Sequence, residues 1–166
     1  MDKLQTKQEL LAKLTALTSV PDDNNIYLKE KVKKALLKSP ELLYAFHNLD
    51  LEDTELFNPD GTINYDGDWT MYYGEEGNIH PHFYLPNTQE KVRHHLCFKT
   101  EFTDIPKYNQ IMCYMNVTFL VMVDVRDAID PLTGITRHDL IGSILRERFN
   151  WSNIFGAHCN IVSDKE

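Results

Sequence analysis

The chain has 166 residues and a mass of 19.4 kDa, which suits one ordinary domain. Its 42% hydrophobic and 25% charged residues exclude a wholly disordered protein. No apolar run approaches the ~20 residues that a membrane helix needs. A net charge of −8 argues against a protein that grips duplex DNA by its phosphates.

The charges are segregated along the chain. Residues 1–38 hold eight lysines and five acids, whereas residues 39–90 hold eleven acids and no lysine or arginine. Residues 91–166 are balanced. The acidic stretch is either a solvated surface or a surface that repels a polyanion or meets a basic partner.

The first 48 residues read as helices. Thr6 and Glu9 have capping-box spacing ahead of leucines at helical intervals, and the pattern stops at Pro21. A lysine-rich amphipathic helix is predicted from about Ile26 to Lys38. Ser39 and Pro40 then suit the start of a short third helix.

Residues 50–77 show no sustained period but contain turn signals and five aromatic residues. A disordered linker would contain fewer aromatic residues, so we expect a long loop that its aromatic side chains hold in place. Pro81 and Pro86 bracket a stretch that reads as extended, as in an edge strand.

Alternating apolar and polar residues predict two strands that pair as an antiparallel hairpin, one over Val92–Phe102 and one from about Gln110 to Arg126. In the first, His95 falls on the polar face. Thr136 with Asp139 has capping spacing before a helix of about Arg137 to Asn150. A closing strand is predicted from Ala157 to Ser163.

These elements predict an α+β fold, in which N-terminal helices pack with an antiparallel sheet of β-β-α-β order that carries one C-terminal helix. We expect a single domain over residues 1–166. Its parts are a helical region (1–48), an acidic aromatic loop region (49–90) and the β-β-α-β core (91–166). The three cysteines, Cys97, Cys113 and Cys159, read as reduced core thiols of a protein made in the cytosol.

Metal sites are possible on paper. His80 with His82, or His95 with Cys97, could share a strand face and reach one ion, but no spaced quartet of ligands follows. The oxygen donors Asp60, Asn64, Asp66 and Asp68 lie close together, yet Tyr65 and Met71 break the EF-hand pattern. We therefore expect no metal and no cofactor.

Catalytic signatures are weak. Cys159 and His158 point to opposite strand faces, and no nucleophile-elbow or phosphate-loop motif is present. The acids at strand and helix ends, such as Asp124 and Asp127, suit ordinary capping as well as catalysis. We expect the protein not to be an enzyme.

Several blocks of the chain resemble small neck and tail proteins of tailed bacteriophages, most closely the tail-terminator or tail-completion type. The TGI-x-RHDL segment that opens the C-terminal helix carries most of this resemblance. The blocks are Lys29–Val32, Ser39–Leu43, the hairpin, Leu132–Ile141 and Phe149–Gly156.

The resemblance implies a virion structural protein, made in the host cytoplasm, that forms a ring at the head–tail junction. Such a ring, expected as a hexamer, would cap the tail tube and join it to the connector, while DNA passes through without specific binding. Its partners would be further copies, the tail tube protein and the connector proteins, and no membrane is implied. A closed ring needs two different complementary patches on each subunit.

We expect these patches among the helix lysines, the acidic aromatic loop and an aromatic cluster after the last helix. The candidate contact residues are Lys31, Lys33, Lys34, Asp53, Glu55, Asp60, Trp69, Tyr72, Tyr73, Trp151, Ile154 and Phe155.

Other functions stay open. Within a virion, the chain could be a head-completion adaptor or a minor tail protein. Outside that class, it could be a metal-dependent enzyme that uses His80, His82, His94 or His95. A cytosolic adaptor that binds a basic partner through the acidic segment is the third alternative.

Overall fold

The fold was analysed in a computed structural model, which describes residues 6–17, 24–84, 91–102 and 115–153. The predicted strand over residues 157–163 and the contact residues Ile154 and Phe155 lie outside these ranges, as do Cys113 and Cys159. None of the described helices has the length and apolar character needed to cross a membrane.

The described part of the chain is an α+β fold, as predicted. Its sheet has the order β1-β2-β3. The elements are α1 (Lys7–Leu17), α2 (Asn24–Leu37), α3 (Pro40–Ala45), α4 (Leu49–Leu51), the π-helical turn η1 (Glu52–Leu56), the 3-10 helix η2 (Trp69–Tyr72), β1 (Ile79–His80), β2 (His95–Phe102), β3 (Met115–Met122), the 3-10 helix η3 (Val125–Asp127) and α5 (Arg137–Phe149).

The antiparallel hairpin is confirmed, with Leu96 opposite Val121 and Phe98 opposite Phe119. The sheet as a whole is mixed, because the short strand β1 pairs with β2 in parallel. The predicted edge strand between Pro81 and Pro86 was wrong: the strand residues are Ile79 and His80, just before the first proline.

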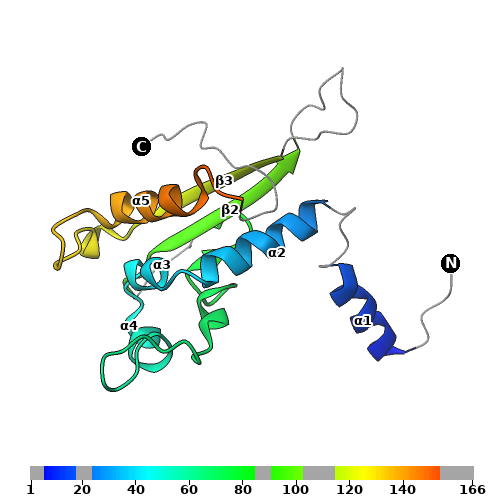
Figure 1. The fold of residues 1–166 in the computed structure, drawn as a ribbon, viewed down its shortest axis with the longest axis horizontal. Coiled ribbons are helices and arrows are strands. Elements are labelled where there is room, and N and C mark those ends of the chain that lie inside the picture. The colour runs from blue at the N-terminus through cyan, green and yellow to red at the C-terminus, as the bar shows by residue number, and fades with distance from the viewer. Residues whose placement is uncertain (1–5, 18–23, 85–90, 103–114, 154–166) are drawn as a thin grey trace.

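Helices cover one face of the sheet. Figure 1 shows α5 along β3 and α2 along β2. One continuous hydrophobic cluster contains Leu36 of α2, Leu43 of α3, Leu96 of β2 and Phe149 of α5. Phe119 stacks on Phe149 at 5.3 Å between ring centroids. The alternation in β2 and β3 therefore supplies the apolar half of a two-layer core.

The side-chain helix caps predicted at Thr6 and Thr136 are confirmed, and the one predicted at Ser39 is not. Glu9 N–H donates to Thr6 Oγ1 at 3.1 Å and Thr6 N–H to Glu9 Oε2 at 3.2 Å, a complete capping box. Thr136 accepts from the Asp139 N–H in the same way. Ser39 does not cap α3 with its side chain, because its hydroxyl donates to the Glu41 carboxylate instead.

The acidic loop region contains more regular structure than expected. Residues 50–77 form short helical turns and tight turns instead of one long loop. Trp69 Nε1 donates to the Glu55 carbonyl at 3.0 Å. Gly67 lies so close to Glu55 that a Cβ on residue 67 would be 2.1 Å from the same carbonyl oxygen. As predicted, aromatic side chains hold the segment in place.

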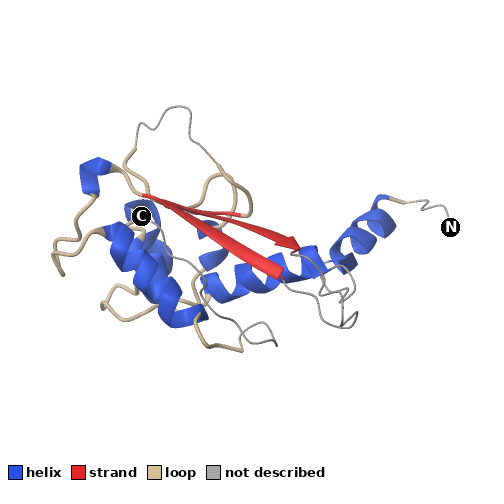
Figure 2. Ribbon diagram, turned by 90° about the horizontal axis from the view of Figure 1, so that it is seen from above, coloured by secondary structure: helices blue, strands red, loops and turns tan. Residues whose placement is uncertain are grey.

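Helix α1 differs from the other long helices because it has no buried residue. Its apolar face is formed by Leu10, Leu11 and Leu14, which are 44%, 50% and 52% exposed. Figure 2, like Figure 1, draws α1 beyond the layer of helices that covers the sheet.

Candidate functional site

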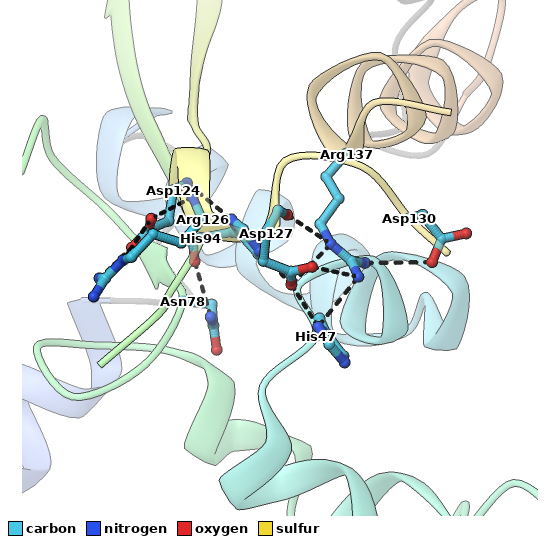
Figure 3. A network of polar contacts seen from close by, with 8 residues as sticks. All are labelled: His47, Asn78, His94, Asp124, Arg126, Asp127, Asp130 and Arg137. Carbon is cyan, nitrogen blue, oxygen red and sulfur yellow. Dashed lines mark hydrogen bonds and ion pairs between the residues drawn. The ribbon is translucent and has the colours of Figure 1, made fainter. Parts of the chain in front are cut away.

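A polar network joins four separate segments of the chain (Figure 3). His47 follows α3, His94 precedes β2, Asp127 ends η3 and Arg137 begins α5. Asp127 lies at the centre and accepts from the other three side chains. The fold thus brings together groups that nothing in the local sequence groups together.

Arg137 is the most buried charge of this network, with 1% of its surface exposed. Its Nε lies 3.1 Å from Asp127 Oδ2, and its Nη1 lies 3.6 Å from Asp130 Oδ1. Nε also donates to the Asp127 carbonyl at 3.1 Å. Asp130 is held in turn by the N–H and hydroxyl of Thr133. A guanidinium paired in this way can be buried without an orphaned charge.

The two histidines have assigned roles. The Asp124 N–H donates to His94 Nδ1 at 3.1 Å, so His94 Nε2 carries the proton that faces Asp127 at 3.2 Å. His47 Nδ1 lies 2.5 Å from Asp127 Oδ2 and 3.1 Å from Arg137 Nη2, and the tautomer with its proton on Nδ1 donates to the carboxylate. Every nitrogen that faces Asp127 is therefore a donor.

Electrostatics agree with this geometry. Partial burial opposes ionisation of Asp127, but hydrogen bonds from His47, His94 and Arg137 hold its pKa below the usual value. Burial lowers the pKa of His94, although Asp127 opposes the shift. Asp124, chelated by Arg126, has its pKa lowered to about 2. Near neutral pH the network therefore contains ionised aspartates and a neutral His94.

This network fits a structural role. Within the described chain, its carboxylate oxygens face donors of the protein itself, and His94 is fully buried. It fastens η3 and the start of α5 to the C-terminal end of α3. Asp127 was considered only as a scattered acid in the sequence. The one available signal was Arg137 in the first turn of α5, where a positive charge opposes the helix dipole.

A second cluster lies on the sheet face that the helices do not cover. His80 Nε2 is 3.0 Å from His95 Nδ1, and the ring of Tyr84 stacks on His80 at 4.5 Å. His95 was predicted to face solvent, which was wrong: it is 5% exposed, because residues 81–84 fold over this end of the face. Burial, with His95 and His82 nearby, lowers the pKa of His80 to about 4.

The four histidines of the metal alternative divide between the two clusters. His94 belongs to the Asp127 network, whereas His80, His82 and His95 belong to the second cluster. Among the described residues, no group of three or more His, Cys, Asp or Glu side chains is placed to hold a metal ion. Cys97 is buried and free, and burial raises the pKa of its thiol, unlike that of an activated nucleophile.

The predicted contact lysines already have neighbours within the chain. Lys33 and Lys34 lie 3.8 Å and 3.7 Å from the Glu30 carboxylate. Lys33 Nζ also lies over the ring of Tyr73, and Lys31 Nζ lies over the ring of Tyr27. These surface contacts are weak, so they leave the lysines able to meet a partner.

The predicted loop contacts divide into exposed and buried groups. Asp53 and Asp60 are exposed, whereas Glu55, Trp69 and Tyr73 are half-buried. Tyr72 is fully buried in the core, so its ring is not available at the surface and the expectation of a contact role does not suit it. Among the described residues, its hydroxyl is one of three buried side-chain groups without a hydrogen bond, with Glu52 Oε1 and His80 Nδ1.

At the other predicted patch, Trp151 follows α5 and is 69% exposed, at a φ of 56°. The segment before α5 adds further exposed apolar side chains. They are Val125, Ile129, Leu132 and Ile135, at 88%, 60%, 78% and 46% exposure. The second strand was predicted to continue to about Arg126. That end was wrong, because β3 ends at Met122 and Asp124 caps a 3-10 turn instead.

Comparison with protein families decides the affiliation. The family model described as YomW matches residues 30–164, which is most of the chain. The protein belongs to the YomW family. That family takes its name from a Bacillus phage or prophage gene, which associates the family with phages. No curated protein and no solved structure gave a match. The YomW match includes the whole Asp127 network and the histidine cluster, and it begins after α1.

Proposed function

We propose that this phage-associated protein is a virion structural subunit of the tail-terminator or tail-completion type. In this proposal, copies of the chain form a ring at the head–tail junction, cap the tail tube and join it to the connector. The observation that carries the proposal is the contrast between its interior and its surface. Its polar network is satisfied internally, whereas large apolar side chains lie exposed on separate elements.

Exposed apolar side chains at separate places suit a ring subunit. Leucines of α1 form one group, and residues 125–135 form another. Singly exposed apolar residues are common, but groups of them mark surfaces that other proteins cover. A cyclic assembly needs two complementary patches per subunit, and a subunit that also joins the tail tube to the connector needs further surfaces for those proteins.

The charge distribution supports the same function. A channel for DNA should not bind the polyanion, and the acidic residues of the cation-free stretch 39–90 would repel it if they face the lumen. In this proposal, the lysines of α2 meet the acidic loop of a neighbouring copy. Charge reversal of Lys31, Lys33 and Lys34 should then weaken assembly, and unchanged assembly would contradict this pairing.

Two measurements test the function. Native mass spectrometry of the purified protein should show a species of six 19.4-kDa subunits without bound metal. Deletion of the gene from the phage that carries it should leave heads and tails that do not join, and the protein should be found in purified tails. Normal virions without the protein would refute a neck role, and a monomer with stoichiometric metal would favour an enzyme. Its presence in tails that still join heads would favour a minor tail protein.

A further inference from the structure

The acidic loop region contains an apolar pocket of about 370 Å³. It lies between α3 and the segment that follows η1. Its lining is Pro40, Glu41, Tyr44, Leu56, Phe57, Ile63 and Tyr65. Six of these seven side chains are apolar or aromatic, and the volume falls within the lower range of ligand pockets, about 300–1,000 Å³. The pocket therefore has the size and the surface to accept apolar side chains.

The walls of the pocket are well supported. Tyr44 and Phe57 meet edge to face at 6.0 Å, and Leu56 is 1% exposed at the base. Phe57 pairs with Ile63 in an isolated bridge. Tyr65 leans on Trp69 at 5.6 Å and is 73% exposed. A rigid base with an exposed aromatic rim is the arrangement found at anchoring sites of protein interfaces.

The same chain carries a segment complementary to this pocket. The leucines of α1 form an apolar stripe of which about half is exposed, with Lys7 one turn before it and Lys13 at its flank. The pocket lies within a stretch that has no cation, with Glu41 at its wall and Asp60 and Asp66 exposed nearby. The apolar stripe of α1 thus suits the apolar pocket, and the lysines of α1 suit the acidic residues around the pocket.

We propose that the leucine face of α1 in one copy fills this pocket in the next copy. The contact is head-to-tail, so each subunit offers one helix and one pocket, and repetition of the contact closes a ring. This inference rests on the proposed ring and names its contact. It concerns residues of this chain that precede the part matched by the family model.

The test uses two variants that each spoil one side. Leu14→Asp places a charge in the leucine stripe, and Ala12→Asp places the same charge on the opposite face of α1 as its control. Tyr65→Asp spoils the pocket rim, and Met71→Asp is its control, since Met71 is equally within the acidic loop region, 50% exposed and outside the pocket. All four sites are exposed, so the fold should survive in each variant.

The expected results are specific. The wild-type chain and both controls should form rings, whereas Leu14→Asp alone and Tyr65→Asp alone should remain monomers. Mixing these two variants, with one isotopically labelled, should give a 1:1 dimer, because the first still has an intact pocket and the second an intact helix. Such complementation occurs only when helix and pocket come from different copies.

The opposite results are equally specific. Rings that persist in Leu14→Asp and Tyr65→Asp would overturn this contact and leave the proposed ring function intact. Two monomeric variants that do not complement each other would also overturn it. A wild-type chain that stays monomeric in solution, with α1 protected from proteolysis by its own pocket, would overturn it as well. Tail joining without the protein would refute the neck function separately.

Discussion

Replacement of Arg137 by methionine tests the central claim about the Asp127 network. Methionine keeps much of the side-chain length but removes the charge and all hydrogen bonds. The change leaves Asp127 without its two guanidinium contacts, at 3.1 and 3.3 Å, and Asp130 without the cation at 3.6 Å. Asp130 is 2% exposed, so water cannot easily replace the lost partner.

The size of the effect follows from burial. Removal of one partner of a buried ion pair costs about 3–5 kcal/mol, because the other charge remains buried without compensation. For a chain of this size, each kcal/mol shifts the melting temperature by roughly 2–4 °C, so a fall of roughly 6–20 °C is expected. A loss near the lower bound would mean that the hydrogen bonds from His47 to Asp127 and from Thr133 to Asp130 still stabilise the two carboxylates.

The assay is urea unfolding followed by circular dichroism, at one protein concentration because assembly adds to apparent stability. Arg146→Met is the control, since Arg146 is on the same helix and exposed, and a change within about 0.5 kcal/mol is expected there. If Arg137→Met lowers the free energy of unfolding by less than about 1 kcal/mol, no more than the control does, the buried cation does not stabilise the fold as argued.

Three further predictions concern stability. The pKa of His80 is about 4 in the folded chain and about 6.5 in the unfolded chain, so the free energy of unfolding should fall by about 3 kcal/mol as the pH drops from 6.5 toward 4. A urea midpoint that does not change between pH 7 and 4.5 would contradict this. His80→Phe should reduce this pH dependence more than His82→Phe, since His82 is exposed. Gly67→Ala should lower the free energy of unfolding by about 1–3 kcal/mol, because the new Cβ would meet the Glu55 carbonyl. Gly142→Ala should raise it by about 0.5–1 kcal/mol, because α5 has open space at that position. Equal shifts of the melting temperature in the two variants would contradict the close packing at Gly67. Leu43→Ala should lower the free energy of unfolding by about 2–5 kcal/mol, because Leu43 is fully buried. Leu49→Ala is the control and should change it very little, since Leu49 is 68% exposed. Similar urea midpoints for the two variants would show that α3 is not part of the core.

Local patterns determined the regular elements of this protein. The capping pairs at Thr6 and Thr136 place the starts of α1 and α5, because a hydroxyl three residues before a backbone N–H satisfies it wherever the helix later packs. The alternation in β2 and β3 likewise predicts the hairpin and its inner face. The α+β class follows from the order of these elements.

Contacts between distant segments decided the rest. The strand β1, the burial of His95 and the end of β3 at Met122 all depend on what packs beside the hairpin, which no residue in the hairpin specifies. Expectations from alternation therefore failed where residues 81–84 cover the polar face and where a 3-10 turn replaces the strand.

The functional surfaces show the same division. The sequence by itself separated basic residues 1–38 from acidic residues 39–90 and showed the leucine stripe of α1, since charge and helical spacing are local properties. Only the tertiary structure joined His47, His94, Asp127 and Arg137, which come from four separate stretches. It also formed the pocket at Tyr44 and Phe57, because a cavity exists only where segments far apart in the chain fail to fill the space between them.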